Sequence, residues 1–340
     1  MPAWPSFGVR LDGSLSARAC IDMTQAAEAS GYDSVWMTEN LFKRGMLPAA
    51  AAAIAATHRI RVGLGVINPY TRHPVQIAMD VGALDELSPG RVALGVGSGN
   101  GERLRRIGAR VERPVAAVHD AIAMIRALLA GERVESHGPV FSAAGVKLDY
   151  AAATPQLPIY AAAMGDQAVR GCGAVADGLI VSNMCAPGFA TWALEVLDQG
   201  ARRAGRPVPR HVIHHVFCVT DRDGATARRR ARHAIAARLA AYWSLGAQVP
   251  VVREAVLRAS GIDPVEYPIA LGRLAAGENT LAVLDDRYLD AYALAGTPEQ
   301  CAESALRFAA AGATEVVLGF CDGDVPSQLR ALGGVFGSRR

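Results

Sequence analysis

The sequence predicts an α/β protein with a (β/α)8 TIM-barrel fold, and two observations carry that prediction. Short apolar runs alternate with helical segments along nearly all of the 340 residues. One of these runs, residues 91–96, follows the turn Ser88-Pro89-Gly90 and leads into a glycine-rich segment over residues 97–101. A strand that is apolar throughout is typical of a parallel sheet covered on both faces, and α/β proteins bind ligands at the carboxyl ends of such strands.

The first half of the chain contains four strand–helix pairs. Glycine or proline marks several of the boundaries, since Gly31 follows the first helix and Pro74 suits the first turn of the third. We expect strands over residues 7–10, 34–37, 61–66 and 91–96, and helices after them over residues 14–30, 47–57, 74–87 and 114–130.

The second half repeats this alternation. We expect strands over residues 158–162, 178–181, 212–219 and 315–318, and helices over residues 167–175, 189–204, 225–245 and 298–311. Thr297 is the expected N-cap of the last of these helices. Eight strands that alternate with helices favour a closed barrel over an open doubly wound sheet.

The whole chain, residues 1–340, is expected to form one barrel domain. Two stretches, residues 131–154 and 246–294, are longer than ordinary connections between barrel elements. We expect both to be insertion segments over the ligand face, where such segments commonly act as lids.

Composition excludes several classes of protein. Hydrophobic residues make up 51% of the chain and the net charge is only +3, so we expect a large core and no binding to nucleic acid or an anionic membrane. The six cysteines lack a metal-binding spacing, which indicates reduced thiols in a cytoplasmic protein. The apolar run 49–56 is too short to span a bilayer, and no signal-peptide pattern is expected at the amino terminus.

The predicted strand ends carry small, amide and hydroxyl side chains and few acids. The polar members are Glu39 and Asn40 after the second strand, Asn68 after the third, Ser98 and Asn100 after the fourth, and Ser182 and Asn183 after the sixth. This set suits a flat ring with polar edges and a phosphate, so we expect no metal site. No Gly-x-Ser-x-Gly elbow joins a strand to a helix, which argues against a Ser-His-Asp hydrolase.

Several motifs carry a resemblance to a known family. They are Gly-Tyr-Asp-Ser-Val-Trp-Met-Thr-Glu-Asn over residues 31–40, Val-Gly-Leu-Gly-Val-Ile-Asn-Pro-Tyr-Thr-Arg-His-Pro over residues 62–74, and Leu-Ser-Pro-Gly-Arg-Val-Ala-Leu-Gly-Val-Gly-Ser-Gly over residues 87–99. With later motifs in the same order, they resemble the bacterial luciferase-like superfamily. Residues 68–74 and 114–131 are most similar to the branch that contains methylenetetrahydromethanopterin reductase.

That resemblance implies an enzyme. The branch uses the 5-deazaflavin coenzyme F420 as a hydride carrier, so we expect an F420-dependent oxidoreductase acting on a small organic substrate such as an imine, an activated alkene or a pterin-like molecule. Other branches use FMN and activate oxygen, so an FMN-dependent monooxygenase is the alternative. A second alternative is a relative that binds the cofactor but has no catalytic activity. The resemblance also implies a homodimer.

The resemblance further implies a site. The cofactor-binding residues would be Glu39, Asn40, Gly65, Val66, Asn68, Gly97, Ser98, Gly99, Asn100, Ala161, Ala162, Ala163, Met164, Gly165, Gly178, Leu179, Ile180, Ser182 and Asn183. A cis peptide bond is expected between Gly65 and Val66. Glu39, Asn100 and His73 are the candidate catalytic residues, with Tyr70 as a further possible acid.

Three positions depart from the pattern of that branch. This chain has Arg10 where methylenetetrahydromethanopterin reductases carry an acid, Asn40 where relatives often carry histidine, and Asn100 where they often carry an acid. The pterin substrate therefore does not follow from the resemblance alone.

Overall fold

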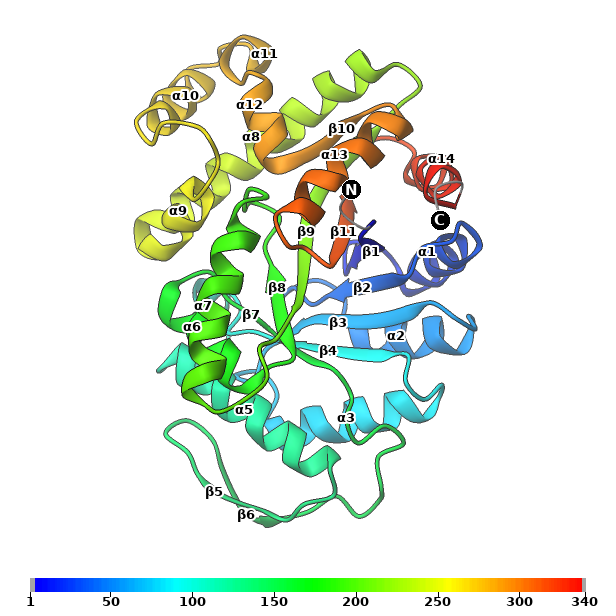
Figure 1. Cartoon of the computed structure of the whole chain (residues 1–340), viewed down its shortest axis with the longest axis vertical. Helices are drawn as coiled ribbons and strands as arrows, with labels where there is room; N and C mark the ends of the chain where they lie inside the picture. Colours follow the sequence, from blue (N-terminus) through cyan, green and yellow to red (C-terminus); the bar gives the residue numbers. More distant parts are fainter. Residues whose placement is uncertain (1–3, 338–340) are drawn as a thin grey trace.

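The computed structural model describes residues 4–337 and has the predicted closed barrel of eight parallel strands with helices around it (Figure 1). The strands run around the barrel in the order β1, β2, β3, β4, β7, β8, β9 and β11, and β11 pairs with β1 to close it. These strands are β1 (Ser6–Asp12), β2 (Ser34–Thr38), β3 (Arg61–Ile67), β4 (Val92–Val96), β7 (Ile159–Ala162), β8 (Gly178–Val181), β9 (His211–Thr220) and β11 (Glu315–Phe320).

Helices cover the outside of the barrel. Those in the predicted positions are α1 (Ala17–Ala29), α2 (Met46–Ala55), α3 (Pro74–Glu86), α5 (Pro114–Leu129), α6 (Asp166–Val175), α7 (Phe189–Arg203), α8 (Gly224–Gln248) and α13 (Pro298–Ala310). Over residues 4–337, no helix combines the length and the apolar character that crossing a bilayer requires.

Some predicted boundaries were wrong. Helix α1 begins at Ala17 rather than at residue 14, because the Ser16 side chain accepts a hydrogen bond from Ala19 N and acts as the N-cap. Besides the elements within the two insertions, the helices α4 (Gly101–Arg106) and α14 (Val325–Gly337) and the strand β10 (Ala293–Gly296) were not predicted. Strand β10 pairs with residues 217–220 of β9, beyond the residues of β9 that pair with β8.

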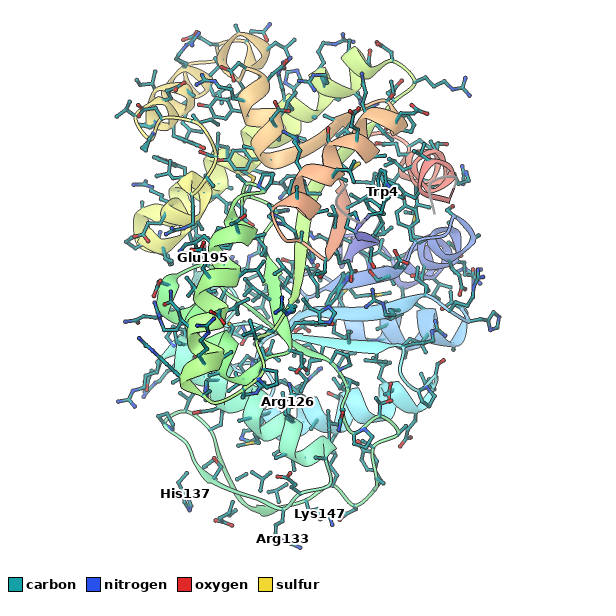
Figure 2. The ribbon with its side chains drawn as sticks, viewed as in Figure 1. Trp4, Arg126, Arg133, His137, Lys147 and Glu195 are labelled. Carbon is teal, nitrogen blue, oxygen red and sulfur yellow. The ribbon has the colours of Figure 1, made fainter. Side chains whose placement is uncertain are left out.

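The first predicted insertion, residues 131–154, forms the hairpin β5 (Val134–His137) and β6 (Ser142–Val146). It packs on the outside of the barrel, where the Tyr150 hydroxyl donates to Met79 O of α3 over 3.1 Å. The labelled side chains Arg133, His137 and Lys147 point away from the barrel at this edge (Figure 2).

The second predicted insertion, residues 246–294, contains the end of α8 and four further helices. These are α9 (Pro250–Leu257), α10 (Glu266–Ala275), α11 (Thr280–Val283) and α12 (Asp286–Tyr292). They gather at the end of the molecule opposite the β5–β6 hairpin (Figure 1). They share a core with α8 and β10 in which Tyr267 and Tyr292 are buried.

The inside of the barrel is filled by the indole of Trp36. Its exposed fraction is 1%, and its Nε1 donates to Glu315 Oε1 over 2.8 Å. The neighbouring strand β3 has glycines where it faces this ring: a Cβ at Gly63 would lie 2.5 Å from Trp36 Cδ2, and one at Gly65 would lie 2.8 Å from Trp36 Cε3. The two glycines therefore make the space that the indole occupies.

Replacement of Gly63 tests this packing. We expect Gly63→Ala to lower the free energy of unfolding by about 1–3 kcal/mol, the usual cost of overfilling a core. Gly272→Ala in α10 is the matched control, because a Cβ there would meet no atom within 4 Å. Urea denaturation should show Gly272→Ala to be as stable as the wild type or slightly more stable, since alanine has a higher helix propensity than glycine. Equal stability of the two variants would contradict this account of the core.

Candidate functional site

One large cavity of about 870 Å³ opens at the carboxyl ends of the barrel strands. Its volume lies in the range of about 300–1,000 Å³ that holds cofactor-sized ligands. Most residues predicted to bind a cofactor line it, namely Asn40, Gly65, Val66, Gly97, Ser98, Gly99, Asn100, Ala161, Ala162, Ala163, Met164, Gly165, Ile180, Ser182 and Asn183.

One wall of the cavity is the bulge in strand β3. The peptide bond between Gly65 and Val66 is cis, as predicted. The pairing of β3 with β4 shifts register between Gly65 and Ile67, so Val66 leaves the ladder and lines the cavity. A Cβ at Gly97 would lie 2.8 Å from Val66 Cγ2, so the two strands approach closely only because Gly97 has no side chain.

The glycine-rich loop after β4 is held by Asn68. The Asn68 Nδ2 donates to Ser98 O over 3.0 Å, and its Oδ1 accepts from Tyr70 N over 2.7 Å. Gly99 has a φ of +71°, and a Cβ there would overlap Asn68 Nδ2. Asn68 does not line the cavity; it joins the loop after β3 to the loop after β4.

Asn100 lines the cavity and also begins helix α4. Its Oδ1 accepts a hydrogen bond from Arg103 N over 3.1 Å, which makes it the N-cap. Its Nδ2 is therefore the atom of this side chain that can donate to a ligand.

The other four predicted residues do not line the cavity. Gly178 lies against His211 O, and Leu179 is buried in the core between barrel and helices. His73 is the N-cap of α3, where its Nδ1 accepts from Val75 N over 3.3 Å. Glu39 sits between the lining residues Thr38 and Asn40; burial raises the pKa of its carboxyl, and the charge of Arg72 partly offsets that rise.

A second wall of the cavity was not predicted from the sequence. It comes from α8, where Arg238, Tyr242 and Leu245 follow one another at helical spacing and line the cavity. The Tyr242 hydroxyl donates to Asn183 Oδ1 over 3.1 Å and lies 2.9 Å from Ser182 Oγ. The i, i+4, i+7 spacing indicates only that these three side chains share one face of the helix, and it does not indicate that this face lies over the cavity.

Apolar side chains complete the enclosure. They come from α5, from α6 and from the segment that includes the start of α9, and they comprise Pro114, Val115, Val118, Val175, Val249, Val251 and Val252. Of the two predicted insertions, only residues 246–294 thus reach the cavity; the hairpin β5–β6 does not, because it lies outside α3 and α5.

The adjacent histidines of β9 face opposite ways. His214 points outward, where its Nε2 lies 2.9 Å from Cys185 O, and burial lowers its pKa to about 4. His215 lines the cavity next to Trp36; burial and then the charge of Arg10 lower its pKa to about 3. Both rings are neutral at pH 7. Within residues 4–337, no cluster of histidine, cysteine and acidic residues could hold a metal ion.

Comparisons with known proteins agree on one family. The model of a family described as luciferase-like monooxygenase matches residues 5–315. The chain is 30% identical over 318 residues to 5,10-methylenetetrahydromethanopterin reductase of Methanolobus tindarius, which covers 92% of this chain and 94% of that protein. It is 33% identical over 255 residues to F420-dependent glucose-6-phosphate dehydrogenase of Beutenbergia cavernae, covering 70% of this chain and 74% of that protein.

A solved structure shares the fold. The coenzyme F420 dependent tetrahydromethanopterin reductase from Methanopyrus kandleri superposes with a TM-score of 0.81 and 22% sequence identity. The superposition covers 97% of this chain and 98% of that one.

The raised pKa of Glu39 predicts how stability depends on pH. The folded protein binds the proton of the Glu39 carboxyl more tightly than the unfolded chain does. The free energy of unfolding therefore falls as the pH rises from 4.5, the ordinary pKa of a glutamate, through the higher pKa of the folded state. We therefore expect Glu39→Gln to be more stable than the wild type at about pH 8 and to lose most of that advantage at about pH 5.

Urea denaturation at the two pH values measures this difference. Glu195→Gln on α7 is the matched control, because it removes one carboxylate from an exposed position (Figure 2). A stability difference between Glu39→Gln and the wild type that is the same at both pH values would contradict the prediction.

Proposed function

The chain belongs to the luciferase-like monooxygenase family, and on that premise we propose that it is a coenzyme F420-dependent oxidoreductase that transfers a hydride to or from a small organic substrate. The observation that carries the proposal is the cavity wall of Gly65, Val66, Gly97 and Gly99, where bare backbone leaves space for a flat ring. The relatives named above include F420-dependent enzymes, which favours the deazaflavin over FMN.

The residues present fit such a cofactor. A flat ring needs an uninterrupted face, and side chains at Gly97 or Gly99 would fill it or displace the residues behind it. Its anionic groups suit the start of α6, where Gly165 provides no side-chain cap and residues 165–168 line the cavity. Uncapped N–H groups at a helix N-terminus favour negative charge.

When bound, coenzyme F420 would supply the hydride carrier. The chain would then contribute orientation and exclusion of water, through Val66 on one side and the valines of α5 and the start of α9 on the other. Good orientation alone can lower a barrier by roughly 7–11 kcal/mol in the most favourable cases.

Orientation and proton transfer would fall to different groups. Asn100 lies on the cavity wall with a free Nδ2, and we assign it the orientation of the ring or the substrate. Glu39 is supported by its raised pKa and by its neighbours Thr38 and Asn40 on the wall. The capping bond of His73 favours a structural role for that residue.

We also propose a cytoplasmic homodimer. The cytoplasmic part is supported by the six cysteines, all of which are free thiols. The homodimer rests on the family resemblance alone.

Gly99→Ala tests the cofactor site. The substitution places a Cβ on Asn68 at a positive φ, so the loop after β4 must move. We expect the affinity for F420, measured by fluorescence titration, to fall at least about tenfold. The melting temperature without ligand should also fall, because the new Cβ is strained at this positive φ, so circular dichroism checks that the variant is folded at the temperature of the titration. Gly272→Ala should leave the affinity unchanged. Unaltered affinity in Gly99→Ala would show that the loop after β4 does not contribute to cofactor binding.

Turnover without oxygen tests the reaction. We expect reduced F420 to be oxidised under anaerobic conditions by a member of a panel of imines, activated alkenes and pterins, followed by the return of the oxidised deazaflavin absorbance. Parallel titrations should show tighter binding of F420 than of FMN. Turnover that requires oxygen and reduced FMN would replace this proposal with an FMN-dependent monooxygenase.

A further inference from the structure

The side of the cavity opposite the glycine wall is positively charged. Arg10 of β1 and Arg238 of α8 both line it, together with His215 and Tyr242. Within the described residues that line the cavity, Asp166 is the only acid, and its carboxylate is paired with Arg170 within α6. The half of the cavity beside β1, β9 and α8 therefore has an excess of positive charge.

Arg10 reaches the cavity because it points into the barrel. Its neighbours Val9 and Leu11 are buried against the helices, so the alternation of a strand turns Arg10 inward. It lies beside Gly319 of β11, where a Cβ would be 3.7 Å from Arg10 Nη1. Because Gly319 has no side chain, β11 places no side-chain atom against the guanidinium at this position.

The charge of Arg10 is only weakly compensated. Its Nη2 lies 3.6 Å from Asp12 Oδ2, and its Nε donates to Thr38 Oγ1 over 3.4 Å. The same Asp12 carboxylate lies 3.1 Å from Lys43 Nζ and accepts from Ser14 N over 2.8 Å. Asp12 is therefore shared among three donors, and its closer cationic partner is Lys43.

Arg238 has no acidic partner within residues 4–337, unlike three of the arginines near the start of the same helix. Arg228 and Arg232 pair with Asp286, and Arg230 pairs with Asp221 and Asp322. The Arg238 guanidinium lies over the face of Phe217, at 5.8 Å from the ring centre. An arginine that lines a cavity and lacks a carboxylate is available to a ligand.

Tyr242 adds a fixed hydroxyl between the two charges. Its hydroxyl is held by Ser182 and Asn183, which follow β8. Tyr242 lines the same cavity as Arg10 and Arg238, and the charge of each guanidinium lowers the pKa of Tyr242 against the larger rise that burial causes. His215 also lines this side of the cavity. Because its ring is neutral, it neither adds to the positive charge nor offsets it.

We propose that the substrate carries an oxyanion group, a carboxylate or a phosphate, that binds between Arg10 and Arg238 beside Tyr242. Guanidinium groups present paired N–H donors that match both kinds of oxyanion. This inference rests on the proposed function, because it places the substrate on the side of the cavity opposite the wall assigned to the cofactor. It selects acidic substrates over neutral ones.

The test measures binding of small probes to the protein saturated with oxidised F420, so that anion sites used by the cofactor are already filled. The probes are propionate, inorganic phosphate and the neutral propionamide. Calorimetry measures the binding of all three, and saturation-transfer NMR measures that of propionate and propionamide, which carry carbon-bound protons. We expect propionate or phosphate to bind at least about tenfold more tightly than propionamide, and Arg10→Gln and Arg238→Gln each to weaken that binding at least about tenfold.

Arg229→Gln is the matched control, because Arg229 lies at an exposed position of the same helix, does not line the cavity and donates to Thr226 Oγ1 over 2.8 Å. It should bind the probes as the wild type does. Circular dichroism checks folding, and Arg238→Gln, at an exposed position, keeps the test valid if Arg10→Gln fails to fold. Whichever of propionate and phosphate binds more tightly indicates whether the oxyanion group of the substrate is a carboxylate or a phosphate.

Failure of this inference and failure of the proposed function give different results. Fluorescence titration of F420 on the wild type tests the function, and if F420 does not bind, the probe titrations are run without it. Loss of oxyanion binding in the two arginine variants supports the inference in either case. Binding that is equal in all variants, or binding of neither oxyanion, overturns it.

Discussion

The rest of this structure depends on how the inside of the barrel is filled by Trp36. The ring fits because Gly63 and Gly65 face it from β3, and it is oriented because its Nε1 donates to the buried carboxylate of Glu315. The same carboxylate accepts from Ser34 Oγ and from Arg61 Nη2, so a buried charge is fully paired. Ile180, Val66 and Ala162 pack with the indole and also line the cavity. The cavity therefore begins where this packed layer ends.

Above that layer, the cavity has two walls of different chemistry. Backbone and small residues from β3, β4 and β7 form one wall, which suits a flat ring. Arg10, Arg238 and Tyr242 form the other, which suits a charged and hydrogen-bonding molecule. An enzyme that transfers a hydride must hold two reactants face to face, and two unlike walls across one cavity provide for both. The second wall depends on α8. The start of this helix forms ion pairs at Arg228 and Arg230, and the part that follows lines the mouth of the barrel.

Particular residues show where sequence analysis succeeded and where it could not. The glycine loop was found because its signal is local: an apolar run followed by closely spaced glycines. The bulge at Gly65 and Val66 was expected from the family resemblance. Arg228, Arg230 and Arg232 at the start of α8 pair with Asp286, Asp221 and Asp322 and do not line the cavity. Arg238, ten residues after Arg228, was missed, because nothing local says that this part of the helix covers the barrel mouth. His73 was proposed as catalytic on its position after β3, whereas its ring caps α3.

The sequence by itself determined the barrel, its strand order along the chain and the wall made of glycine and small residues. Each of these follows from patterns within a few residues: period-two or continuous apolar runs, helix periodicity, and glycine where backbone must come close. Only the tertiary structure decided which side chains share the opposite wall. Arg10 and His215 meet because β11 pairs with both β1 and β9 when the barrel closes. Tyr242 joins them because its hydroxyl bonds Ser182 and Asn183 after β8. Such contacts join residues far apart in the chain, and no local pattern encodes them.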